Sequence, residues 1–269
     1  MADYRKIGFI GSGKMAGAII NGLVKNRIGA SIIATKAEKE GVEERSKELG
    51  IEIILDNKEL VKNSNVIFIA VKPNQVLGVL EEIKPFVTQD KLIISIAAGV
   101  TLKTLESNLP ENTRVIRVMP NTPALIGEGI CGIVGGSHLY KYDVSIIADW
   151  LEYLGEYIVF DDEAQLDIVT AISGSGPAFF YKVMNDIARA GEKLGMDYDK
   201  ALLLSIQTAI GSAKMALNRD ISMEELIANV ATKGGCTAVG IDCMNENNTE
   251  KLFYDVISKT TIKANELGK

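Results

Sequence analysis

Residues 6–20, KIGFIGSGKMAGAII, decide the fold of this chain. The first five, Lys6–Ile10, form the short apolar run that is typical of a buried strand. Gly11, Gly13 and Ala16 follow with the spacing G-x-G-x-x-G/A, directly before an apolar helical pattern. In such a unit the first glycine permits a tight turn, the second lets the backbone approach a pyrophosphate, and the helix N-terminus supplies free N–H groups. The stretch predicts a dinucleotide-binding unit; a plain glycine-rich helix cap is the alternative interpretation.

Seven further short runs continue this pattern to about residue 160, and helical stretches separate them. Two of them, VIFIAV and LIISIA, are apolar throughout, as strands buried on both faces should be. We therefore expect an α/β fold class whose N-terminal domain, residues 1–162, has a Rossmann-type parallel sheet. The seven runs are residues 31–35, 51–55, 66–71, 92–96, 114–118, 130–134 and 157–160.

The remaining residues, 163–269, show helical patterns and no convincing strand, and predict an all-α second domain. One helix is expected at about 177–194, ended by Gly195, and another after Ser222, which forms a capping box with Glu225. A third, at about 200–217, is apolar nearly all round. A helix without a polar face must be buried on every side, so we infer a subunit interface at this helix.

The chain has 269 residues, 47% of them hydrophobic and 24% charged, which is typical of a globular protein. Its net charge of -6 argues against nucleic acid or an anionic membrane as a partner. The three cysteines show neither zinc spacing nor a disulfide framework, so no metal site and a reducing cytoplasm are expected. Neither a signal peptide nor a membrane-spanning run is evident.

Cofactor choice is predicted from the end of the second strand, residues 31–35. Enzymes that use NAD commonly place Asp or Glu there to bind the ribose 2′-hydroxyl, whereas this sequence has Thr35 and Lys36. A hydroxyl and an ammonium suit a 2′-phosphate, and the pair favours NADP(H) over NAD(H). The alternative is that Lys36 is a solvated surface lysine.

The sequence shows little sign of an acid–base catalytic apparatus. His138 is the only histidine and lies in GGSHLYKYD, which we interpret as a surface loop. A reductase without a catalytic histidine is reasonable if its substrate already carries the proton, as the iminium form of a cyclic imine does. The loop TKGGCT, residues 232–237, offers backbone N–H groups for a carboxylate and the Thr237 hydroxyl for such a ring. By itself, this loop also reads as an ordinary helix–helix connection.

A series of motifs resembles the pyrroline-5-carboxylate reductase family, in the order of that family and over nearly the whole chain. The motifs are GFIGSGKMA, AVKP, SIAAGV, MPNTPALIGEG, SGSGPAF and TKGGCT. The resemblance implies NAD(P)H-dependent reduction of 1-pyrroline-5-carboxylate to L-proline, the last step of proline synthesis. It also implies homodimers with interlocked helical domains, often gathered into larger rings.

The same resemblance implies site residues. The pyrophosphate region would be bound by Ile10, Gly11, Ser12, Gly13, Lys14 and Met15, and the adenosine side by Asn57. The cofactor would also be lined by Ala70, Val71, Lys72, Pro73, Ala97, Ala98 and, from the helical domain, Asn229. The substrate carboxylate would be taken by Thr232, Gly234, Gly235 and Cys236, with Thr237 on the ring nitrogen and Glu163 on the substrate side.

One departure from the family pattern concerns this loop, where Lys233 replaces the usual proline and Cys236 the following small residue. Lys233 frees the backbone φ angle and adds a cation near the expected carboxylate. For SGSGPA, close helix packing and direct substrate contact remain alternatives.

Two other functions compete with this interpretation. A β-hydroxyacid dehydrogenase shares the two-domain plan, but Lys182 and Asn185 are out of register with the helix motif of that family. A non-catalytic NADP(H)-binding sensor is the third hypothesis, and it would require the glycines of the 232–237 loop and Thr237 to be dispensable.

Overall fold

The computed structural model describes residues 4–217 and 220–267. Residues 1–3, 218–219 and 268–269 lie outside this description. The first residues of the predicted domain 1–162 and the last residues of the predicted domain 163–269 are therefore not described. The chain divides into two compact units. The first takes in the chain up to Ser175 and again from Lys259, and the second runs from Gly176 to Ser258. This division falls at other positions than the predicted domain boundary after residue 162, which stays a prediction.

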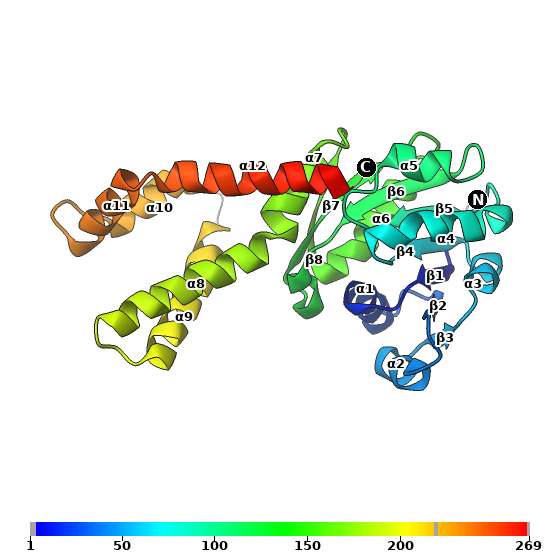
Figure 1. Ribbon diagram of the computed structural model, residues 1–269, viewed down its shortest axis with the longest axis horizontal. Coiled ribbons are helices and arrows are strands. Elements are labelled where there is room, and N and C mark those ends of the chain that lie inside the picture. Colours follow the sequence, from blue (N-terminus) through cyan, green and yellow to red (C-terminus); the bar gives the residue numbers. More distant parts are fainter. Residues whose placement is uncertain (1–3, 218–219, 268–269) are drawn as a thin grey trace. The chain divides into compact units, whose positions relative to one another are not determined.

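The first unit is built on one eight-stranded sheet with the order β3-β2-β1-β4-β5-β6-β7-β8 (Figure 1). All eight runs expected from the sequence are strands, with ends that shift by a residue or two. The strands are β1 (Lys6–Ile10), β2 (Ser31–Thr35), β3 (Glu52–Ile54), β4 (Val66–Ile69), β5 (Leu92–Ser95), β6 (Arg114–Met119), β7 (Gly129–Gly135) and β8 (Gly155–Phe160).

One pair of strands departs from the predicted parallel sheet. β6 and β7 are antiparallel, with Ile116 opposite Gly135, while β8 runs parallel to β7. Only residues 120–128 join β6 to β7, and a parallel crossover needs a dozen residues or more. The short connection is fixed by the Asn121 side chain, whose Oδ1 accepts a hydrogen bond from the Ile130 N–H at 3.0 Å.

Helices cover both faces of this sheet. Along β4, Phe68 packs into one apolar cluster and its neighbours Ile67 and Ile69 into the other, which explains why the strand is apolar at every position. One face is covered by α1 (Lys14–Lys25), α2 (Val42–Leu49) and α6 (Asp143–Leu151). The other is covered by α3 (Asn57–Asn63), α4 (Val76–Ile83) and α5 (Leu102–Ser107).

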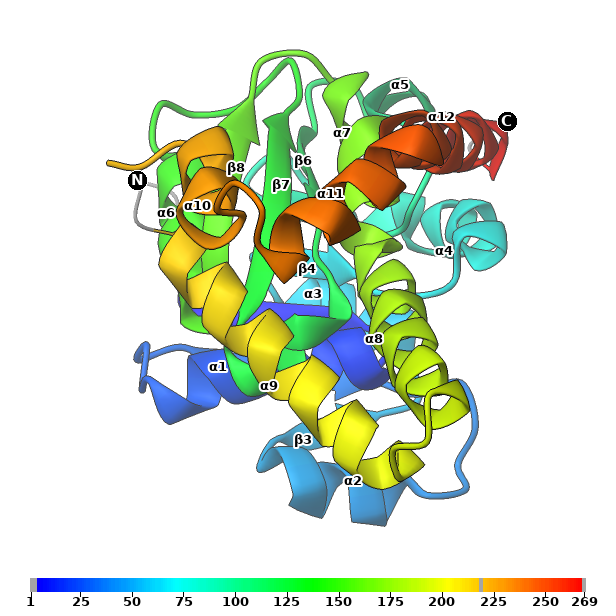
Figure 2. The same ribbon diagram turned by 90° about the vertical axis from the view of Figure 1, so that its left-hand side faces the viewer.

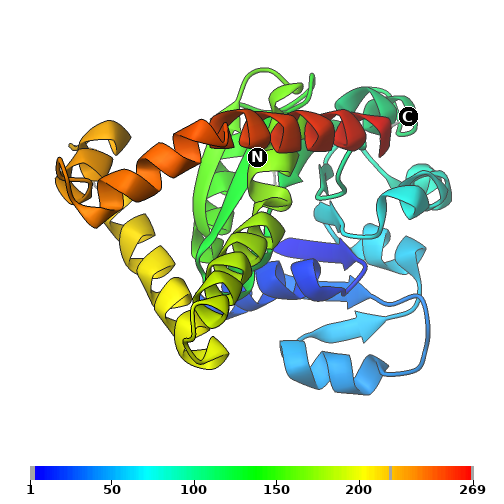
Figure 3. The same cartoon turned by 60° about the vertical axis from the view of Figure 1, so that its left-hand side comes forward.

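The second unit is helical, as predicted, and it begins with a hairpin of two long helices, α8 (Gly176–Lys193) and α9 (Tyr198–Ala216) (Figure 2). Gly195 ends α8 with φ +97°, and the Met196 N–H bonds the Gly191 carbonyl at 3.0 Å. Gly195 therefore ends this helix, as predicted from the sequence. α10 (Met223–Val230), α11 (Cys236–Glu246) and α12 (Thr249–Leu267) follow, drawn in orange to red (Figure 3).

The α9 helix leaves most of its apolar surface uncovered in the single chain. Leu203 is 67% exposed and Met215 65% exposed, whereas its buried residues, Ala201 and Ser205, are small. Uncovered apolar surface on this scale marks a contact with another protein surface. It is consistent with the subunit interface expected at this helix.

Candidate functional site

The first unit carries its candidate cofactor site where strand order reverses. β1 lies between β2 and β4, and the chain moves outward from it in both directions. In such sheets, ligands bind outside the carboxyl ends of the strands at this switch point. Gly11 and Ala70 directly follow their strands at that edge, Thr35 ends its strand there, and Ala97 lies two residues after its strand.

Gly11 makes the tight turn that begins the glycine-rich loop, residues 11–13. Its φ is +97°, and a Cβ atom added there would lie 2.7 Å from the Ala70 carbonyl oxygen. Gly13 then caps α1 in an extended conformation without any side-chain cap, and nothing lies within 4 Å of its own added Cβ position. A turn that only glycine fits, followed by an uncapped helix start, is the backbone that a dinucleotide pyrophosphate requires.

Thr35 supports this loop from β2. Its hydroxyl accepts the Gly11 N–H at 3.2 Å and donates its own hydrogen to Asn57 Oδ1 at 2.7 Å, and the residue is 3% exposed. A hydroxyl has one hydrogen, so none is left here for a phosphate oxygen. The structure thus places Thr35 beneath the loop, where it holds Gly11.

Lys36 and Asn57 lie on either side of Thr35. The Lys36 ammonium bonds the Glu40 carbonyl, near the end of the loop that leads into α2. Asn57 is the first residue of α3, and its amide nitrogen donates to Glu82 Oε2 at 2.8 Å. Both therefore lie at the β2 side of the crevice, where the adenosine end of a dinucleotide is expected.

The residues predicted after β4 and β5 also reach this edge. Ala70 continues the sheet for one more residue, since its N–H bonds the Ile10 carbonyl at 2.9 Å. Val71 and Lys72 follow, and Pro73 opens a short 3₁₀ helix, Pro73–Gln75. After β5, the Ala97 N–H bonds the Ser95 hydroxyl at 3.3 Å, and Ala98 is next in the chain. These segments therefore lie at the sheet edge where the walls of the cofactor crevice are predicted.

Glu163 has structural partners within the first unit. Its Oε1 accepts the Leu102 N–H at 2.6 Å, which caps the start of α5, and it also pairs with Arg117 of β6. The Arg117 side chain is 6% exposed and that of Glu163 is 28% exposed. The carboxylate therefore anchors β6 to α5, and its predicted substrate contact remains untested.

The TKGGCT loop lies in the second unit and forms a tight turn before α11. The Gly235 N–H bonds the Thr232 carbonyl at 2.9 Å, and Gly234 has φ +78°. This is the geometry of a type II turn, in which Lys233 takes the position that favours proline. The turn therefore keeps its shape without the proline.

Helix α11 starts at this turn without a side-chain cap. Cys236 is its first residue and is exposed, and Thr237 is partly buried. The first N–H groups of an uncapped helix are free to bind an anion. On α10, Asn229 is exposed as well.

The SGSGPA motif spans an irregular helical stretch. A π-helical turn, Thr170–Gly174, precedes α8, and the Ser175 N–H bonds the Thr170 carbonyl at 2.8 Å. A Cβ atom on Gly174 would lie 2.6 Å from the Met119 Cε atom, so this glycine packs closely against the Met119 side chain. Substrate contact by this motif stays a prediction.

One residue beside the glycine-rich loop escaped the sequence analysis. Arg45 of α2 donates from Nε to the Ser12 carbonyl at 2.8 Å and from Nη2 to the Gly13 carbonyl at 2.9 Å. A charged residue on a surface helix gives no signal by itself. The glycine that makes room for it, Gly17 near the start of α1, is the feature that could have indicated it.

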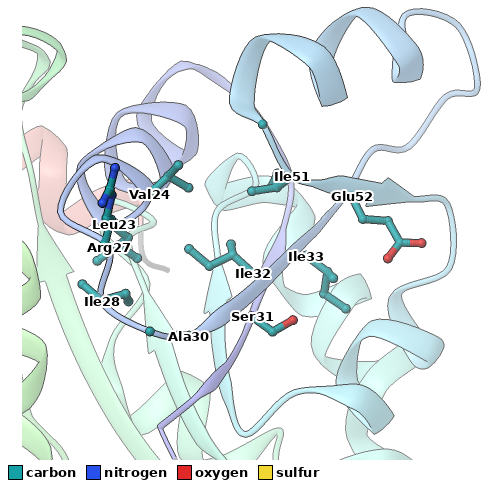
Figure 4. Close-up of a pocket in the computed structure, with 12 residues that line it drawn as sticks. Leu23, Val24, Arg27, Ile28, Ala30, Ser31, Ile32, Ile33, Ile51 and Glu52 are labelled. Atoms are coloured by element: carbon teal, nitrogen blue, oxygen red, sulfur yellow. The ribbon is translucent and has the colours of Figure 1, made fainter.

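A hollow of about 390 Å³ lies at the amino ends of β2 and β3, away from the crevice, and its polar side chains are Arg27, Ser31 and Glu52 (Figure 4). The histidine, His138, is exposed in the loop after β7, as interpreted from the sequence. Within residues 4–217 and 220–267, no helix is long and apolar enough to cross a membrane, and no cluster of potential metal ligands occurs.

The sheet order, the glycine-only turn and the uncapped helix start define a Rossmann-type dinucleotide-binding protein. Residues 6–99 match the family model described as NADP oxidoreductase coenzyme F420-dependent. Residues 163–267 match the model described as pyrroline-5-carboxylate reductase dimerisation, which together with the bare surface of α9 supports a homo-oligomer.

Full-length relatives make the assignment specific. The pyrroline-5-carboxylate reductase of Pseudomonas aeruginosa is 36% identical over 98% of this chain and 97% of the relative. That of Methanosarcina acetivorans is 37% identical over 99% of both chains. The chain belongs to the pyrroline-5-carboxylate reductase family.

Solved structures agree with this assignment. A pyrroline-5-carboxylate reductase from Coxiella burnetii superposes with a TM-score of 0.92 at 32% identity, covering 99% of this chain and 100% of that one. The Plasmodium falciparum pyrroline carboxylate reductase, solved with NADP bound, gives 0.87 at 29% identity and full coverage of both chains (100% each). A prephenate dehydrogenase from A. aeolicus, at 11% identity and 0.58, shares the fold alone.

Proposed function

We propose that this chain transfers a hydride from NADPH to the C=N bond of 1-pyrroline-5-carboxylate and so forms L-proline, the final step of proline biosynthesis. The observation that carries the proposal is the relation over 98% of the chain to a pyrroline-5-carboxylate reductase. The switch-point crevice supports it independently, because it has the backbone that NADP(H) requires.

The residues of the first unit would hold the cofactor. The glycine-rich loop and the N-terminus of α1 receive the pyrophosphate, and Lys36 lies where a 2′-phosphate would be neutralised. This lysine, and the absence of a carboxylate at its position, favour NADPH over NADH. When bound, NADPH supplies the hydride. Ala70–Pro73 and Ala97–Ala98 would line the crevice beside it.

The residues of the second unit would hold the substrate. The free N–H groups at the start of α11 bind the carboxylate, and the Thr237 hydroxyl bonds the ring nitrogen. These two points orient the ring, and the iminium already carries the proton that the product amine keeps. The chain therefore needs no general acid, which suits a sequence whose one histidine is exposed and remote from the loop in sequence.

The assembly and the location complete the proposal. The apolar surface of α9 would be covered by the helical unit of a second copy, giving a homodimer, and dimers would gather into a ring. A light-scattering mass of one 29.1 kDa chain at micromolar concentration would contradict the dimer. A cytoplasmic location fits cysteines that are all free, two of them exposed.

One assay tests the reaction. Purified protein, NADPH and 1-pyrroline-5-carboxylate are followed at the absorbance of the cofactor, and proline is identified as the product by mass spectrometry. Gly11→Ala serves as the matched control, because its methyl group would displace the loop against Ala70 and abolish cofactor use. A parent protein that binds NADPH and produces no proline would leave the sensor hypothesis in place.

A further inference from the structure

The contacts of Arg45 connect two segments of the cofactor side that are far apart in sequence. Its guanidinium donates to the Ser12 and Gly13 carbonyls at 2.8 and 2.9 Å, and its Nη1 atom pairs with Glu48 Oε2 at 2.7 Å. The side chain is 18% exposed, so most of it lies against the loop. Hydrogen bonds from a charged donor are stronger than those between neutral groups.

The position of this guanidinium depends on a glycine in α1. A Cβ atom on Gly17 would lie 2.3 Å from Arg45 Nη2, so no other residue leaves room for the side chain as it stands. Glycine inside a helix is unfavourable compared with alanine. Gly17 is the fourth residue of α1 and is buried, and the guanidinium gives a local reason for a glycine at this position.

The bonds to these carbonyls set the direction of the neighbouring N–H groups. In a trans peptide, the C=O and the following N–H point in opposite directions. By holding the Ser12 and Gly13 carbonyls, Arg45 turns the N–H groups of Gly13 and Lys14 away from itself. Neither N–H donates to another group in the part of the chain that the structure describes, and both residues are exposed.

We propose that Arg45, seated in the slot left by Gly17, is a positioning residue that presets the glycine-rich loop for the cofactor pyrophosphate. It acts through the loop and does not touch the cofactor. Without it, two peptide groups could rotate and present carbonyl oxygens to the anion. The proposal rests on the proposed use of NADP(H), but not on the identity of the substrate.

Cofactor binding tests this role directly, by fluorescence titration of the purified protein with NADPH and with NADH. We expect Arg45→Ala to raise both dissociation constants by about 5- to 30-fold, the scale of lost charge-assisted hydrogen bonds. Arg45→Lys should recover less than half of that loss, because one ammonium cannot replace the fork of donors. Lys47→Ala, which removes the same charge from an exposed position of α2, should bind as the parent does.

A double-mutant cycle with Gly17 tests the coupling. Gly17→Ala should weaken NADPH binding like Arg45→Ala, because the methyl group expels the guanidinium. In the Arg45→Ala background it should have no further effect on binding and should raise the melting temperature. The melting temperature also reports whether each variant is folded.

Three results would overturn the inference. They are parent-like NADPH binding by Arg45→Ala, additive losses in the cycle, and a loss confined to NADPH, which would make Arg45 a ligand of the 2′-phosphate. Steady-state kinetics gives a further criterion, since KM for NADPH should rise while kcat at saturating NADPH stays within about twofold. If the parent binds NADPH but reduces no imine, the proposed function fails while the binding cycle still decides the role of Arg45.

Discussion

Replacing Thr35 by valine separates support of the glycine-rich loop from recognition of the 2′-phosphate. Valine keeps the shape of threonine and removes the hydroxyl that accepts the Gly11 N–H and donates to Asn57. Two hydrogen bonds are lost at a residue that is 3% exposed, and the Gly11 N–H loses its acceptor. We expect the free energy of unfolding to fall by about 2–3 kcal/mol.

The effect on cofactor binding follows from the same contacts. With Gly11 released, NADPH and NADH should both bind more weakly, by a similar factor of roughly 5–30. Their ratio should stay that of the parent, because Thr35 has no hydrogen to give a phosphate. Lys36→Ala should do the opposite: it should lower the preference for NADPH by about tenfold and leave the affinity for NADH unchanged.

The measurements are urea denaturation and titration with both cofactors. Thr113→Val is the matched control, since Thr113 is also 3% exposed and its hydroxyl bonds the Pro110 carbonyl at 2.6 Å, at the amino end of β6. It should lose stability and keep cofactor affinity. If Thr35→Val abolishes the preference for NADPH while binding NADH normally, the support role is refuted and Thr35 contacts the phosphate.

Three further predictions concern other residues. Thr237→Val should lower kcat/KM for the imine by about 5- to 150-fold with NADPH affinity unchanged, and turnover at the parent rate would show that the substrate site is misplaced. Asp143→Asn should lower the free energy of unfolding by about 3–5 kcal/mol, because Arg114, which is 2% exposed, loses its counter-charge. Urea denaturation measures this loss, and a value under about 1 kcal/mol would contradict the prediction. Burial raises the pKa of the Cys131 thiol to about 12, so this thiol stays protonated at pH 8 and should resist iodoacetamide until the protein is unfolded. Peptide mass spectrometry measures the labelling, and labelling of Cys131 in the native protein would contradict its burial.

The sequence predicts the strands well because each leaves a compact apolar run. It does not predict the direction of β7, since an apolar run carries no direction and only the short link after Met119 sets it. The sequence does not predict the hydrogen bonds of the Thr35 hydroxyl either, because its partners, Gly11 and Asn57, are 24 and 22 residues away. Arg45 shows the limit most clearly, since its role depends on two carbonyl groups that have no sequence signature.

The motifs predict more about the TKGGCT loop than the periodicity does. Periodicity alone predicts a helix start there, and the family resemblance adds a predicted role in substrate binding. What the sequence left open was the effect of Lys233, because proline and lysine can both adopt the backbone angles of this turn position. The bond from Gly235 to Thr232 answers that point for the turn itself.

Helix α12 belongs to both compact units, since the division falls between Ser258 and Lys259 within it. Its later half packs on the first unit, where Ala264 is 3% exposed and the Asn265 amide bonds Asp167 at 3.0 Å. The second unit is therefore an insertion in the first, and the chain passes between the two units twice, after Ser175 and after Ser258. After a single proteolytic cut within residues 176–258, the C-terminal fragment would still be held on the first unit by the packing of the later half of α12. Residues 259–267, which pack on the first unit, are synthesised only after the whole second unit, so we expect the folding of the two units to be coupled.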